Sequence, residues 1–110
     1  MVTRDILIRH VKEVMEQLIK LDDPTEHKNY RIICDENNSI YELKYLSWEK
    51  TKRIRGNIVD VEIIDDLVWV HHDGTDRFIS FLEEKGVSKD QIVLGWLPRS
   101  SRLLTDYAKV

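Results

Sequence analysis

Apolar side chains in the first part of the chain recur at steps of three and four residues, and charged residues occupy most of the positions between them. The apolar set is Leu7, Val11, Val14, Met15, Leu18 and Leu21. This period places one apolar stripe along an α-helix, which we expect from about Thr3 to Leu21. Pro24 ends it, because a proline disfavours helical backbone in the residue before it. The stripe favours packing on a sheet of the same chain over the alternative of a partner-binding helix.

From Tyr30 the pattern of apolar residues changes to a period of two, which is typical of half-buried strands. Two strands, 30–35 and 39–47, flank Glu36-Asn37-Asn38, and asparagine suits a tight hairpin turn. A third strand is expected over 53–64, where Gly56-Asn57 indicates either a bulge or a close approach of another chain segment. A fourth runs from Leu67 to His71 or His72. Turns this short join antiparallel strands, so the four strands form a meander.

The last third of the chain predicts three short elements. Apolar residues from Phe78 to Leu82 have helical spacing, and Gly86 suits the end of that helix. A short strand follows from Gln91 to Leu97, ended by Pro98, and a short helix from about Ser101 to Ala108 closes the chain. The order α-ββββ-α-β-α predicts an α+β fold, a two-layer sandwich. At 110 residues it forms a single domain over residues 1–110.

Composition narrows the classes of function. The apolar share is 42% and the charged share 34%, as in folded soluble chains. No apolar run approaches the roughly 20 residues of a membrane helix, and the N-terminus lacks a signal-peptide pattern, so we expect a cytoplasmic protein. Cys34 is the single cysteine, which rules out an internal disulfide. The net charge is −3, whereas a freestanding binder of duplex DNA has a basic excess.

The stretch VWVHHDGTD, residues 68–76, contains the densest group of chemically active side chains. Successive strand residues point to opposite faces, so His71 and His72 do not easily reach one ion. We therefore predict no metal and no cofactor. The alternative is a small hydrolase or metal enzyme centred on His72, Asp73 and Thr75, with His72 as the base. The chain has no nucleophile elbow, phosphate loop or zinc-protease motif, which favours the absence of catalytic residues.

The same stretch has a structural interpretation as the junction between a strand and a helix. Asp73 or Thr75 can accept hydrogen bonds from amides of the first helical turn. Gly74 gives the backbone freedom to turn. Asp76 suits the positive end of the helix dipole. Junction chemistry thus explains most of these residues without a substrate.

Two other groups of residues suggest contact with another molecule. Basic residues surround Trp48, and such interleaving can follow a nucleic-acid backbone or a partner surface; they are Lys44, Lys50, Lys52, Arg53 and Arg55. A solvated loop at a sheet edge is the alternative. Near the C-terminus, Trp and Arg side chains can anchor a protein interface; the candidates are Trp96, Arg99 and Arg102, beside Pro98. Burial of Trp96 in the core is the alternative there.

In their order along the chain, these motifs resemble the XisI family, the excision controlling factors first associated with a DNA element that interrupts the fdxN gene in nitrogen-fixing photosynthetic bacteria. The residues that carry the resemblance are Trp48, Gly56, Trp69, Asp73, Gly74, Thr75, Asp76, Gly86, Gly95, Pro98, Arg102 and Thr105. The chain departs from the family pattern at a few positions: Asp76 replaces a glutamate, Trp96 a phenylalanine, Asp60 a histidine and Asp66-Leu67 a Gly-Lys pair.

The resemblance implies a non-enzymatic accessory factor that controls excision of a DNA element by site-specific recombination. It implies a protein partner similar to XisH, with a nuclease-like fold, and a serine-type recombinase that acts beside both. Contact with DNA is then indirect, and self-association into a homodimer is compatible with the role. The alternative is a nucleic-acid-binding module that uses the segment from Lys50 to Arg55.

Overall fold

A computed structural model describes all residues from Met1 to Val110. The N-terminal helix α1, Arg4–Lys20, confirms the predicted helix almost residue for residue. The Thr3 hydroxyl oxygen accepts a hydrogen bond from the Ile6 amide and caps its first turn. The apolar stripe is buried as predicted, except that Leu21 is 54% exposed. Leu21 lies just after the last turn of α1, where the apolar side chains no longer pack on the sheet.

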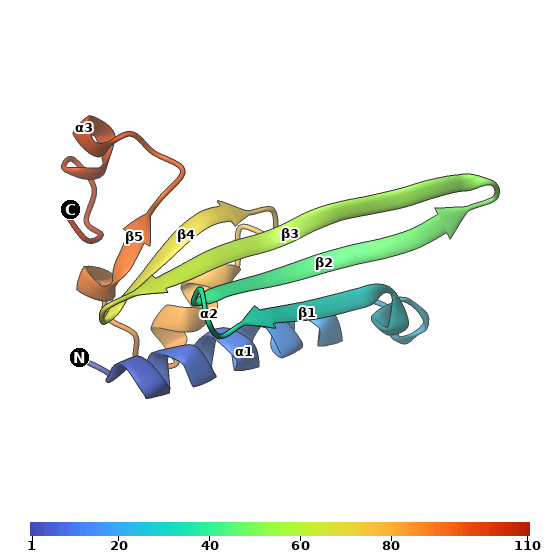
Figure 1. Cartoon of the computed structure of the whole chain (residues 1–110), viewed down its shortest axis with the longest axis horizontal. Coiled ribbons are helices and arrows are strands. Elements are labelled where there is room, and N and C mark those ends of the chain that lie inside the picture. The colour runs from blue at the N-terminus through green and yellow to red at the C-terminus, as the bar shows by residue number, and fades with distance from the viewer.

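The chain then forms the predicted antiparallel meander. A 3-10 helix, η1, Pro24–Asn29, leads into the four strands, which are β1 Tyr30–Asp35, β2 Ile40–Glu49, β3 Lys52–Ile64 and β4 Leu67–Asp73. β2 and β3 extend beyond the other strands as a two-stranded arm, which makes the molecule 45 Å long and about 28 Å across (Figure 1). In the β1–β2 turn the left-handed residue is Ser39, with φ 56°, and not an asparagine. Asn38 contributes to the turn through its side-chain amide, which donates a hydrogen bond to the Asp35 carboxylate.

Two bulges interrupt the register. Leu43 lies opposite Val59 while Lys44 lies opposite Asn57, so Ile58 is the extra residue on β3. A bulge, one of the two alternatives at Gly56-Asn57, is therefore present one residue further along. A second shift, unpredicted, makes His71 the extra residue on β4 opposite Asp60 and Val61.

The last strand, β5, Ile92–Leu94, pairs parallel with β4, and the sheet order is β1-β2-β3-β4-β5. Helix α2, Phe78–Glu84, makes the crossover between these parallel strands, as a parallel connection requires. The predicted strand from Gln91 to Leu97 is too long. Gln91 belongs to the short 3-10 helix η2, Lys89–Gln91. β5 ends at Leu94, and the pairing with β4 closes with the Gly95 amide, which donates to the Val70 carbonyl.

The predicted C-terminal helix from Ser101 to Ala108 is also too long, because α3 covers only Arg99–Arg102. Beyond α3 the chain returns to the sheet, where the Ala108 amide donates to the carbonyl oxygen of Ile92. A helix continued to Ala108 cannot make that contact. The local sequence allows a helix, but the bond to β5 decides the backbone path.

Helices α1 and α2 lie side by side on one face of the sheet and bury a single apolar cluster of 17 residues. Figure 1 shows both helices on the same side of the strands. The α+β two-layer architecture is therefore confirmed, with five strands in a mixed sheet. No helix is long and apolar enough to cross a membrane.

Gln91 is the one fully buried polar residue, and it fixes the N-terminus to the sheet. Its amide nitrogen donates to the carbonyl oxygens of Val2 and Asp66, at 2.9 and 3.0 Å. Its side-chain oxygen accepts from the Val2 amide at 3.0 Å. Three backbone groups from distant parts of the chain therefore depend on one carboxamide.

Replacement of Gln91 by leucine keeps the approximate volume and removes all three bonds. We expect Gln91→Leu to lower the free energy of unfolding by about 2 kcal/mol, since each buried group left without a partner is costly. Urea denaturation followed by circular dichroism measures the change. The matched control is Gln17→Leu on α1, where the side chain makes no hydrogen bond and the change should stay within about 0.5 kcal/mol. Equal effects of the two substitutions would contradict this role of Gln91.

Candidate functional site

The turn between β4 and α2 is built by a short relay of side-chain hydrogen bonds. The Asp73 carboxylate accepts from the amide and the hydroxyl of Thr75, at 2.9 and 2.6 Å. The Thr75 hydroxyl oxygen in turn accepts from the amides of Arg77 and Phe78, at 3.0 and 3.2 Å. Thr75 therefore satisfies amides of the first helical turn, and Asp73 orients Thr75. The structural interpretation of these two residues as junction chemistry is confirmed.

The roles predicted for Gly74 and Asp76 need correction. The left-handed residue of this turn is Asp76, with φ 58°, and not the glycine. Gly74 is required for close approach instead. A Cβ atom there would lie 3.2 Å from the Ile58 carbonyl oxygen and 3.3 Å from the His72 ring. Its amide donates to that same carbonyl at 2.7 Å, which closes the end of β4 onto the bulge of β3.

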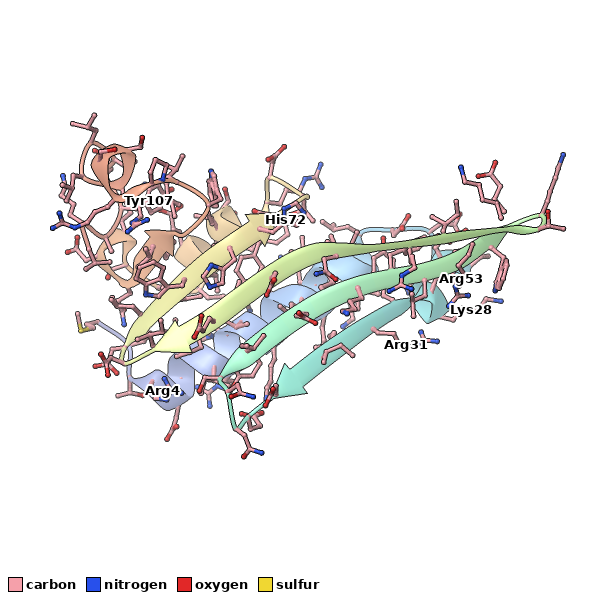
Figure 2. All side chains as sticks on the ribbon, turned by 45° about the horizontal axis from the view of Figure 1, so that its top comes forward. Arg4, Lys28, Arg31, Arg53, His72 and Tyr107 are labelled. Atoms are coloured by element: carbon pink, nitrogen blue, oxygen red, sulfur yellow. The ribbon has the colours of Figure 1, made fainter.

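His71 and His72 do not follow the simple alternation of a strand, because His71 is the bulged residue. The His71 Nε2 atom lies 3.1 Å from a carboxylate oxygen of Glu62. His72 lies opposite Asp60 at the end of β4 (Figure 2). Burial raises the pKa of the Asp60 carboxyl, and the two nearby histidines only partly oppose that rise. They lie near the same carboxylate, yet no group of three or more His, Cys, Asp or Glu side chains is arranged to hold a metal ion.

A pocket of about 540 Å³ opens beside this turn. It lies at the carboxyl ends of the parallel strands β4 and β5, the usual position for a binding site in a βαβ unit. Residues from β4, α2, β5 and the C-terminal segment line it; they are His72, Asp73, Asp76, Ile79, Ser80, Leu94, Trp96 and Tyr107. Sequence reasoning found the first three and Trp96 separately. It missed Tyr107, since only the return of the C-terminal segment to β5 brings that ring to the pocket.

The C-terminal candidates have different roles. Trp96 forms part of the pocket wall and is 49% exposed, so the alternative in which it fills the core is wrong. Pro98 and Arg99 are exposed beside it at the start of α3. Arg102 is used within the chain: its guanidinium donates to the Leu97 and Val110 carbonyls. It also lies 5.2 Å from the centre of the Trp69 ring. Trp96 and Arg99 thus remain available to another molecule.

The basic segment forms the tip of the arm rather than a loop. Trp48 is 63% exposed, and the Arg53 guanidinium lies 5.0 Å from the centre of its ring. Trp48 and Leu46 lie opposite Arg53 and Arg55, so both arginines share one face of the arm. Lys50 is in the turn itself, with φ 57°, and Lys52 lies opposite Glu49 on the other face. The arm therefore places Arg53 and Arg55 on one face, Lys52 on the other face and Lys50 in the turn.

Pairing between β1 and β2 adds Arg31, a cation that is distant in sequence from the basic segment. Arg31 lies directly opposite Lys44, on the same face as Arg53 and Arg55. Figure 2 shows Lys28, Arg31 and Arg53 toward the same end of the sheet. The predicted hairpin, with strands 30–35 and 39–47, did not fix this pair. The structure pairs Asp35 with Ile40, and this register brings Arg31 opposite Lys44.

We expect the relay at the β4–α2 turn to stabilise the fold rather than to perform chemistry. Thr75→Val removes the acceptor for two amides and should lower the free energy of unfolding by about 1 kcal/mol. Thr51→Val, in the exposed turn of the arm, is the matched control and should have little effect. Thermal denaturation of both variants measures the difference. A Thr75→Val protein as stable as the parent would show that the relay contributes nothing to folding.

The comparisons with known proteins agree with this geometry. A XisI-like protein from Anabaena variabilis ATCC 29413 is 26% identical, with a TM-score of 0.75; the match covers 94% of this chain and 99% of that one. The fdxN element excision controlling factor XisI from the same organism is 23% identical, with a TM-score of 0.67 and the same coverage, and it shows a common fold. No curated protein matches the chain.

The family comparison extends over almost the whole molecule. The model of the XisI protein family matches residues 3–109, from the cap of α1 to the end of the C-terminal segment. All the elements that form the pocket and the arm lie within this range. The chain therefore belongs to the XisI family.

Proposed function

We propose that this protein is a non-enzymatic accessory factor that controls excision of a DNA element. The observation that carries the proposal is the family match over residues 3–109, together with a structural relative that is an fdxN element excision controlling factor. The structure supports a role without catalysis at the most reactive cluster. The Thr75 hydroxyl is committed to Asp73 and to two backbone amides, and no hydrogen bond joins it to His72.

We further propose that the protein acts by binding a XisH-like protein of nuclease-like fold. The pocket end of the molecule supports a protein contact there. Trp96 is half-exposed beside the exposed residues Pro98 and Arg99. Large aromatic side chains of this kind dominate the binding energy of many protein interfaces. The pocket also contains the carboxylates of Asp73 and Asp76, which suit the basic surface that a DNA-processing protein presents.

The deciding experiment is co-purification of the tagged chain with a XisH-like protein from the same genome. We expect a complex with a micromolar or lower dissociation constant, and Trp96→Ala should weaken it by about 30-fold. Trp48→Ala, at the far end of the molecule, is the matched control and should leave the affinity unchanged. Isothermal titration calorimetry gives the dissociation constants. Failure of the parent proteins to associate at micromolar concentration would contradict the proposal.

Direct binding of DNA through the arm is the alternative, and the charge distribution disfavours it. The same sheet face that presents Arg53 and Arg55 also presents Glu42, Asp60 and Glu62, which repel phosphates. The net charge of −3 adds no general attraction. Fluorescence anisotropy with single- and double-stranded DNA across a salt series tests the alternative. Affinity that falls with salt and is lost in Arg53→Ala would favour the arm as a DNA contact.

A further inference from the structure

One face of the sheet is uncovered over β1, β2 and β3. Figure 2 shows these strands in front, with α1 behind them and no helix on the near side. The buried residues Tyr41 and Leu43 face the helices, so the alternate residues of β2 lie on the uncovered face. Apolar side chains are among them and their neighbours: Ile33 is 43% and Ile64 is 40% exposed.

Charge on this uncovered face is sorted by position along the strands. The half toward the arm is basic and consists of Arg31, Lys44, Arg53 and Arg55. The half toward the β1–β2 turn is acidic and consists of Glu42, Asp60 and Glu62. The boundary between the two halves falls on β2, between Glu42 and Lys44.

The register places like charges directly opposite each other in both halves. Arg31 lies opposite Lys44, and Glu42 lies opposite Asp60. Such cross-strand pairs destabilise an isolated sheet. Partial burial raises the pKa of the Asp60 carboxyl, and the nearby charge of Glu42 raises it further. The arrangement is therefore unfavourable for a chain whose sheet face meets only water.

Contacts within the chain compensate for part of this charge: in the acidic half, the His71 Nε2 atom lies 3.1 Å from a carboxylate oxygen of Glu62. Lys44 and Glu42, with 3.5 Å between their charged atoms, form the one ion pair across the boundary. Arg31 donates to backbone carbonyls, and Arg53 stacks on Trp48. None of the three arginines meets a carboxylate. Both halves thus retain charge that can pair with an external surface.

We propose that two copies of this chain pair through the uncovered face in antiparallel orientation, with the basic half of each copy on the acidic half of the other. A two-fold axis at the boundary between Glu42 and Lys44 superposes each half on its complement, as an interface between identical surfaces requires. Sheets that pack face to face in this way lie about 10 Å apart, a separation that their side chains fill.

A second copy fits this face better than a nucleic acid or a uniformly charged protein. A phosphate backbone would meet the basic half and be repelled by the acidic half. A basic partner would bind the acidic half and be repelled by the basic half. The face carries one charge on each side of a single boundary, and only a partner with the same sorting in reverse order satisfies both. The dimer is independent of the proposed contact at Trp96, which lies at the pocket end of the molecule.

Sedimentation velocity of the full chain tests the dimer. We expect a dimer at low salt whose dissociation constant rises at least about tenfold in high salt, because the charges are partly exposed and are screened. Two double variants separate the halves. Arg53→Glu with Arg55→Glu places acidic side chains in the basic half, and Glu42→Lys with Glu62→Lys places basic side chains in the acidic half. Each alone should dimerise at least about 100-fold more weakly than the parent, since like charges then meet across the interface.

An equimolar mixture of the two double variants should restore a dimer, this time a heterodimer, because the introduced glutamates of one variant then meet the introduced lysines of the other. Circular dichroism of each variant establishes that it is folded. A parent chain that stays monomeric at low salt, or folded variants that fail to associate when mixed, would overturn the inference. A monomeric parent that binds duplex DNA through Arg53 and Arg55 would also overturn it and assign the face to nucleic acid.

Failure of this inference is distinguishable from failure of the proposed function. The variant with Arg53→Glu and Arg55→Glu retains Trp96 and the whole pocket, so it should still co-purify with the XisH-like protein. Loss of the dimer with retention of that complex would confirm that the two surfaces are separate. Loss of both in a folded variant would contradict the assignment of the partner contact to the pocket end.

Discussion

The structure depends on the contact between two helices and one face of its sheet. Helices α1 and α2 place their apolar side chains on the inward residues of β2, β3 and β4, and this layer of contact forms the main apolar cluster. The opposite face is covered only over β4 and β5, where Val93 is fully buried and Arg102 lies over the Trp69 ring. The opposite face carries polar and charged residues in the same alternation, since a strand that is half-buried has an apolar residue at every second position. The candidate contact surfaces lie where the cover of α1 and α2 ends: on the uncovered face, on the arm, or at the ends of β4 and β5.

This arrangement leaves exposed side chains at two opposite ends of the molecule, the pocket end and the arm. At one end, the crossover from β4 through α2 to β5 leaves a pocket whose walls come from four parts of the chain. At the other end, β2 and β3 continue past the core as an arm with exposed Trp48 and stacked Arg53. At the pocket end the Thr75 hydroxyl is bonded to Asp73 and to two backbone amides. Both ends present aromatic and charged side chains suited to recognition, in agreement with a family of controlling factors.

Most of the fold was predictable because it follows from local periodicity. The helix at 4–20 and the four strands of the meander match patterns of 3.6 and 2 residues that tertiary contacts reinforce. The errors occur where a long-range contact overrides local preference. Gln91 was assigned to a strand because it borders Ile92 and Val93, yet its side chain serves Val2 and Asp66. Thr105 to Ala108 suited a helix, yet the Ala108 amide binds to Ile92.

The sequence by itself determined the amphipathic elements, the capping chemistry of Asp73 and Thr75, and the family to which the chain belongs. These depend on residues close together along the chain, whose spacing is visible without a structure. Only the tertiary structure decided which distant side chains meet. The parallel pairing of β5 with β4 joined Trp96 and Tyr107 to His72 in one pocket. The cross-strand register sorted Arg31 with Lys44 and Glu42 with Asp60, because pairing between strands and not sequence spacing sets the neighbours on a sheet face.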